Sequence, residues 1–108
     1  MTIPRDQLLT LIHTLGAAQT YLAHPDVLRV FGDESNEAAL EMAEISGYLL
    51  PSGVITRSAS RKIVSSLRNA ANILNNKKTR AIPFALNSAN ISRALRTFAT
   101  AIIKSFHL

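Results

Sequence analysis

The chain has 108 residues, a length typical of one domain, and we predict a single domain over residues 1–108. Its 47% of hydrophobic residues suffices for one core and argues against disorder over most of the length. It has no cysteine, which excludes disulfides and thiolate metal sites and fits the cytoplasmic location that we expect. The first residues resemble no signal peptide, and no apolar run predicts a transmembrane segment.

Charge is divided unequally along the chain. Residues 1–45 contain all seven acidic residues and only two basic ones, a net charge of −5. Residues 46–108 contain ten basic residues and no acidic one, a net charge of +10. This separation indicates either an anionic partner for the basic half or attraction between the two halves.

Apolar residues recur every three or four positions in four stretches, which is the pattern of amphipathic helices. We predict main helices at about 4–23, 35–49, 57–75 and 88–106, with a short helical turn near 25–31. The four prolines lie where these patterns start or stop, as expected for a residue that breaks helix interiors. Short connections between such helices favour a small four-helix bundle, so the predicted fold class is all-α.

The predicted N-capping residues of the second, third and fourth main helices are, in order, Asp33 or Ser35, Thr56 or Ser58, and Asn87 or Ser88. The third helix should stop in the polar run 75–78. Residues 79–86 are the least regular segment. Ile82, Phe84 and Leu86 alternate as in a strand, but a single short strand has nothing to pair with, so we expect a packed loop.

Helical geometry, at about 100° per residue, shows where the charges point. The glutamates of the predicted helix 35–49, and the one just before it, lie about 90° from the apolar stripe of that helix. There they would form an acidic stripe able to bind a partner. This acidic stripe consists of Glu34, Glu37, Glu41 and Glu44. The basic residues point away from the core, and the arginines of 57–75 lie about 140° from its apolar stripe. The candidate anion-binding residues are Arg57, Arg61, Lys62, Arg68, Lys77, Lys78, Arg80, Arg93, Arg96 and Lys104.

The outer face of a helix normally mixes charges, whereas the two C-terminal helices and their connection carry only positive ones. The leading hypothesis is therefore a small non-enzymatic binding protein, an accessory or regulatory factor, whose basic half engages nucleic acid or another polyanion. Asparagines in the same half could reach phosphates or base edges. They are Asn69, Asn72, Asn75, Asn76 and Asn87. Aromatic residues are few and mostly at core-like spacing, so little is available for stacking on single strands.

Residues 86–95, Leu-Asn-Ser-Ala-Asn-Ile-Ser-Arg-Ala-Leu, resemble the turn and recognition helix of the lac-repressor-type helix-turn-helix family. The resemblance implies that Asn87 caps the helix. It also implies that Asn90, Ser92 and Arg93 face DNA. It covers ten residues; Pro83 stands where the supporting helix would run. A capped amphipathic helix is the other interpretation of this segment.

The alternative function is a protein–protein interaction module with charge-complementary faces, either a small inhibitor or adaptor or a self-associating homo-oligomer. Binding to a membrane surface has less support, because the bundle core needs the apolar stripe of 88–106. We expect no enzyme, no catalytic residue, no cofactor and no metal. The histidines, His13, His24 and His107, lack metal-ligand spacing, and one glutamate stripe offers no converging ligands.

Overall fold

The structure is a computed structural model that describes residues 1–85 and 87–108. Its described residues form six α-helices. They are α1 (Arg5–Leu22), α2 (Pro25–Phe31), α3 (Asp33–Leu49), α4 (Arg57–Leu74), α5 (Lys77–Arg80) and α6 (Ser88–Phe106). The all-α prediction is confirmed, and the ends of the four long helices lie within two residues of the predicted ones.

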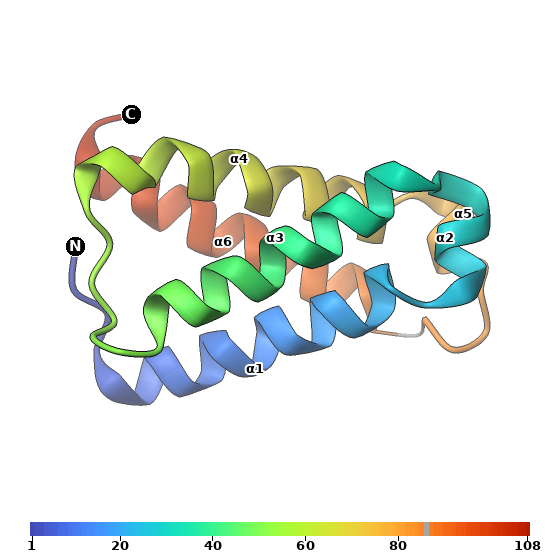
Figure 1. The fold of residues 1–108 in the computed structure, drawn as a ribbon, viewed down its shortest axis with the longest axis horizontal. Helices are drawn as coiled ribbons and strands as arrows, with labels where there is room; N and C mark the ends of the chain where they lie inside the picture. Colours follow the sequence, from blue (N-terminus) through green and yellow to red (C-terminus); the bar gives the residue numbers. More distant parts are fainter. Residues whose placement is uncertain (86) are drawn as a thin grey trace.

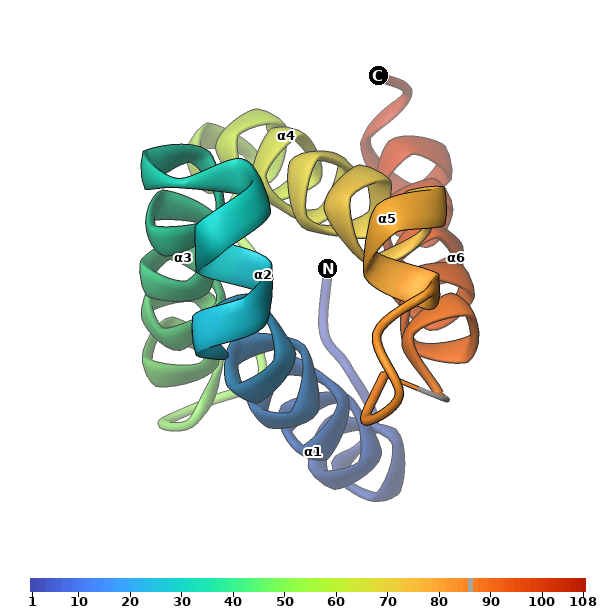
Figure 2. The same cartoon turned by 90° about the vertical axis from the view of Figure 1, so that its right-hand side faces the viewer.

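The four long helices form a bundle in which each helix runs opposite to the next along the chain (Figure 1). Seen along the bundle, α1, α3, α4 and α6 occupy its four corners in that order (Figure 2). Contacts are most extensive between α4 and α6, and next between α1 and α3. The contact between α1 and α6 is the least extensive of the four neighbouring pairs. The short helices α2 and α5 both lie at the same end of the bundle (Figure 1).

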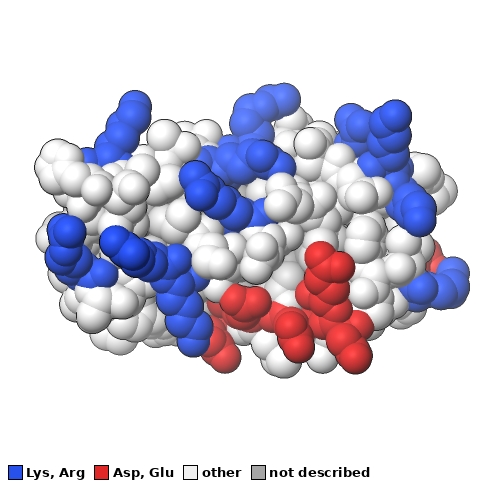
Figure 3. All heavy atoms as spheres, turned by 90° about the horizontal axis from the view of Figure 1, so that it is seen from above, with Lys and Arg blue, Asp and Glu red and all other residues white. Residues whose placement is uncertain are grey.

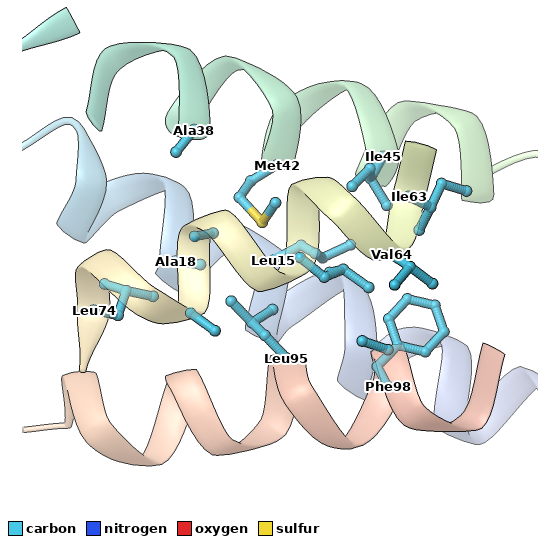
Figure 4. Packing of buried hydrophobic residues seen from close by; sticks show 14 of the residues in the cluster. Leu15, Ala18, Ala38, Met42, Ile45, Ile63, Val64, Leu74, Leu95 and Phe98 are labelled. Atoms are coloured by element: carbon cyan, nitrogen blue, oxygen red, sulfur yellow. The ribbon is translucent and has the colours of Figure 1, made fainter. Parts of the chain in front are cut away.

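Each long helix contributes an apolar stripe to one shared core (Figure 4). Leu15 of α1, Met42 of α3, Leu67 of α4 and Leu95 of α6 are fully buried. Burying a side chain of this size contributes about 1.5–3 kcal/mol, so these stripes drive the packing of the bundle. The predicted stripes supply this core, while several of their outer members are only half-buried. These are Leu8, Leu11, Ile12, Ala59, Ile91 and Phe106.

The start of α3 differs from the prediction that Asp33 or Ser35 is its cap. Gly32, with a φ of 60°, both ends α2 and precedes α3, and no side chain caps α3. The Ser35 hydroxyl is instead buried and donates to the carbonyl of Leu22 at 2.6 Å. The prediction was wrong because the last carbonyls of α1 offer Ser35 an acceptor that local sequence does not reveal.

The caps of α4 and α6 are closer to the predictions. Thr56 precedes α4 and its hydroxyl accepts a hydrogen bond from the Ala59 N–H at 3.3 Å. Asn87 occupies the N-cap position of α6, but its side chain makes no capping hydrogen bond.

The connection between α4 and α6 contains a helical turn that the sequence did not predict. Asn76 accepts a hydrogen bond from the Lys78 N–H at 2.9 Å and so starts α5. The predicted packed loop is confirmed for residues 81–85, whereas Leu86 lies outside the described residues. Phe84 anchors this segment by stacking on His24, with ring centroids 3.6 Å apart, and on Tyr21 at 5.4 Å.

The N-terminal residues pair with the connection between α3 and α4. Ile3 N–H donates to the carbonyl of Gly53 at 2.9 Å, and Ile55 N–H donates to that of Met1 at 2.8 Å. Gly53 has a φ of 66°, a conformation that glycine adopts without strain. This short pairing closes the end of the bundle opposite α2 and α5 (Figure 1).

Candidate functional site

All ten predicted anion-binding residues are exposed. Among the described residues, one arginine or lysine forms an ion pair: Arg29 contacts Asp26 in α2 at 3.1 Å. No lysine or arginine of α4, α5 or α6 forms an ion pair with a described acidic residue. Figure 3 shows basic side chains spread over most of the view and acidic ones gathered in the middle of its lower half, with basic side chains on either side of them. The positive charge of the C-terminal half is therefore not neutralised within the molecule.

The structure brings part of this set together in a groove between α4 and the end of α6. The groove has a volume of about 590 Å³. We call it the α4–α6 groove; it is lined by Arg61, Val64, Ser65, Arg68, Asn69, Asn72, Ile103 and Leu108. Its polar lining comes from α4, and its apolar floor comes from Val64 and Ile103. Two guanidinium groups and two amides thus share one concave surface.

Two further arginines, one on each helix, are held by hydrogen bonds between α4 and α6. Arg96 of α6 donates to Asn72 Oδ1 at 2.7 Å. Arg57, at the start of α4, donates to the carbonyl of Phe106 at 3.1 Å. A guanidinium group has five N–H donors, so each arginine keeps donors for another acceptor.

Helix periodicity explains why α4 presents its arginines on one side. Residues 57, 61 and 68 fall within about 40° of one another around the helix axis. They lie on the side of α4 that faces α6, because Asn72 on the same side contacts Arg96. The sequence placed these arginines almost opposite the core, whereas the structure places them beside the seam between α4 and α6.

The remaining basic residues lie elsewhere. Lys62 lines a separate pocket of about 230 Å³ between α3 and α4, together with Glu41 and Glu44. Arg93 lines a groove between α1 and α6. Lys104 is exposed in the last turn of α6. The three bases Lys77, Lys78 and Arg80 belong to α5, at the end of the bundle.

The acidic stripe of α3 is mostly unpartnered in the described structure. Glu34, Glu37 and Glu44 are exposed, and none forms an ion pair with a described basic residue. Glu41 is half-buried and accepts a hydrogen bond from the Ser66 hydroxyl of α4. The seam between α3 and α4 is therefore joined by a hydroxyl–carboxylate contact and not by ion pairs.

Comparison with known proteins gives no relative, since no family model, curated protein or solved structure matches this chain. The site must therefore be interpreted from its own chemistry. Among the described residues, no group of three His, Asp or Glu side chains could hold a metal ion. In the same residues, no helix is long and apolar enough to cross a membrane.

The structure contradicts the resemblance to a helix-turn-helix. Ser92, which would face DNA, is 1% exposed and donates to the carbonyl of Ala71 in α4 at 2.8 Å. The supporting helix is missing too, because α5 is a single turn of four residues. Asn90 and Arg93 lie beside the groove between α1 and α6. The side of α6 that would enter DNA is partly occupied by packing against α4.

A second groove, between α1 and α6, was not predicted. It measures about 680 Å³ and is also lined by the N-terminal residues 1–4. Small and hydroxyl-bearing residues leave this seam open, and they are Thr10, Thr14, Ala94, Thr97 and Ala101. Their spacing of three, four or seven residues along each helix is the signal in the sequence that could have revealed it.

Proposed function

We propose that the protein is a non-enzymatic nucleic-acid-binding factor whose basic C-terminal half holds phosphate groups at the α4–α6 groove. One observation carries the proposal: within the described residues, the bases of α4, α5 and α6 are exposed and have no acidic partner. A surface of one charge is not needed to fold a bundle, whereas it is what a polyanion requires.

The chemistry of the groove suits phosphate. Arginine presents a planar fork of donors that matches two phosphate oxygens, which makes it a stronger phosphate ligand than a point charge. Arg61 and Arg68 are free to make such contacts, and Asn72 holds Arg96 beside them. Each phosphate that these residues neutralise releases condensed counterions, so binding should weaken steeply as salt rises.

The test is fluorescence anisotropy with labelled DNA at about 50 and 200 mM salt. We compare the wild type with R61E/R68E, which reverses two charges of the α4–α6 groove. The matched control is K62E/R93E, which makes the same change in net charge at one position of α4 and one position of α6, both outside the groove.

The groove variant should lose at least about tenfold in affinity and should reduce the salt slope by about two. The control should lose much less. Absence of binding at low salt, or an affinity that does not change with salt concentration, would overturn the proposal. Equal losses in the two variants would show that net charge and not the groove controls binding.

The second candidate is a protein-interaction module, and the unpartnered acidic stripe of α3 favours it. Glu37 and Glu44 are exposed on a helix adjacent to the basic α4, so the two signs stay separate within one molecule. The acidic stripe of one copy could then dock on the basic surface of another. Sedimentation velocity over a range of protein and salt concentrations tests this, and a monomer under every condition would eliminate self-association.

A further inference from the structure

We infer that the nucleic acid bound at this surface is double-stranded and is held by its phosphates without reading of the bases. This inference rests on the proposed function and narrows its partner to one form of nucleic acid. Three features of the described residues carry it: a straight row of donors along α4, the absence of a free aromatic ring beside that row, and the packing of α4 between two neighbours.

The row of donors follows one side of α4. Exposed residues able to donate to phosphate recur every three or four positions: Arg57, Arg61, Ser65, Arg68, Asn72 and Asn75. We call them the α4 row. Eighteen residues separate its ends, which is about 27 Å at the rise of an α-helix. This length corresponds to about eight base-pair steps of a duplex.

A straight row of donors, three of which are arginines, matches a duplex better than a single strand. Duplex DNA presents one charge per about 1.7 Å of axis, because both of its strands contribute phosphates. A duplex is also stiff, with a persistence length of about 50 nm, so it can lie along a rigid helix without first being ordered. A flexible single strand would lose conformational entropy to follow the same row.

Single-strand binding normally gains much of its affinity from bases stacked on aromatic rings. The phenylalanine rings of the C-terminal half are occupied in this structure. Phe98 is buried, Phe106 is half-buried against the core, and Phe84 stacks on His24 and Tyr21. Among the described residues, the basic surface therefore offers no exposed phenylalanine ring on which a base could stack.

The exposed ring of Tyr48 does not change this conclusion. It belongs to α3, lines the pocket between α3 and α4 together with Glu41 and Glu44, and its hydroxyl is hydrogen-bonded to that of Thr56 at 3.1 Å. Acidic neighbours disfavour a nucleic acid at this position.

The neighbours of α4 prevent it from reading bases. The major groove is about 12 Å wide and admits one helix. In this bundle α4 is flanked by α3 and α6, and the molecule measures 25 × 19 Å across its two shorter axes. With α3 and α6 packed on both of its sides, α4 presents the α4 row on the surface of the bundle, where the row meets phosphates before base edges. Binding should therefore be independent of sequence.

The experiment measures anisotropy at low salt with two unrelated labelled duplexes of about 20 base pairs and with their separate strands, chosen without self-complementarity. We expect the two duplexes to bind within about twofold of each other and at least about fivefold more tightly than any strand. R61E/R68E should remove most of this preference, whereas K62E/R93E should keep it.

The outcomes separate this inference from the proposed function. Strands that bind as tightly as the duplexes, or one duplex that binds more than about tenfold better than the other, would overturn the inference and leave nucleic-acid binding intact. No binding of either form would overturn the proposed function, and the inference with it.

Discussion

Replacing Ser92 by alanine tests the packing of α6 and the location of the binding surface together. The Ser92 hydroxyl is 1% exposed and donates to the carbonyl of Ala71 at 2.8 Å. That carbonyl also accepts the N–H of Asn75 at 2.9 Å. The substitution therefore removes one hydrogen bond without leaving the carbonyl unpaired, which limits the loss to about 1 kcal/mol. The better helix propensity of alanine returns a few tenths of a kcal/mol.

We therefore expect Ser92→Ala to lower the free energy of unfolding by about 0.5–1 kcal/mol in urea titrations followed by circular dichroism. Ser105→Ala makes the same chemical change at an exposed position of α6 and should stay within about 0.5 kcal/mol of the wild type. Ser92→Leu should lose at least about 1–3 kcal/mol, because α4 and α6 are the most extensively packed pair. DNA affinity of the folded Ser92→Ala variant should equal that of the wild type. A loss of affinity with unchanged stability would refute this reasoning and restore the recognition-helix interpretation.

Three other substitutions test the backbone and the connection before α6. Gly47→Ala, where an added Cβ meets nothing within 4 Å, should raise the free energy of unfolding by about 0.5–1 kcal/mol, and a loss would show that the position is not open helix. Gly53→Ala should lower the free energy of unfolding by at least about 1 kcal/mol, since φ is +66° and the new Cβ would lie 3.0 Å from Leu8 Cδ2. An unchanged free energy of unfolding would contradict the left-handed backbone conformation at this position. Phe84→Ala should lower it by about 1–3 kcal/mol and speed amide exchange in residues 81–85, and unchanged exchange would show that the ring does not anchor them.

The long helices could be predicted because their signals are local. In α4, a capping Thr56, an apolar residue every three or four positions and a polar run after Leu74 together fix both ends. The spacing of the apolar residues also places α6 correctly, although the Asn87 side chain makes no capping hydrogen bond. Neighbouring residues carry this information, so the prediction needs no knowledge of how the helices pack.

The errors arose where a polar group finds a distant partner. Asp33 or Ser35 was expected to cap α3, but the acceptor of the Ser35 hydroxyl is the carbonyl of Leu22, thirteen residues earlier. The resemblance to a helix-turn-helix implied that Ser92 faces DNA, but its acceptor lies in α4, twenty-one residues earlier. A serine that is buried by tertiary packing looks in the sequence like one that caps or binds.

For the site, the sign of the charge could be predicted, but the grouping of the bases could not. Arg61 and Lys62 are adjacent in sequence and were predicted as members of one set. They point about 100° apart around α4, and as a result Arg61 lines the α4–α6 groove while Lys62 lies beside Glu41. The bond from Arg96 to Asn72 joins residues that are twenty-four positions apart, so only the packing of α4 on α6 reveals it.

The effect of salt on stability tests whether the arginines are free. The two helices that carry most of the basic surface, α4 and α6, are also the most extensively packed pair, so their buried residues must hold them together against the repulsion of their charges. Arg61 and Arg68 are separated by seven residues, a rise of about 10 Å, and at that distance two unit charges in water repel by about 0.4 kcal/mol. Raising salt from about 20 to 300 mM screens this repulsion.

Thermal unfolding in a KCl series should therefore show a small rise in Tm while the affinity for DNA falls steeply. Arg61→Glu should show a smaller rise than the wild type, because it turns this repulsion into an attraction. If Tm fell as salt rose, attraction between the acids of α3 and the bases of α4 or α6 would dominate, and the arginines would not be free to bind phosphate.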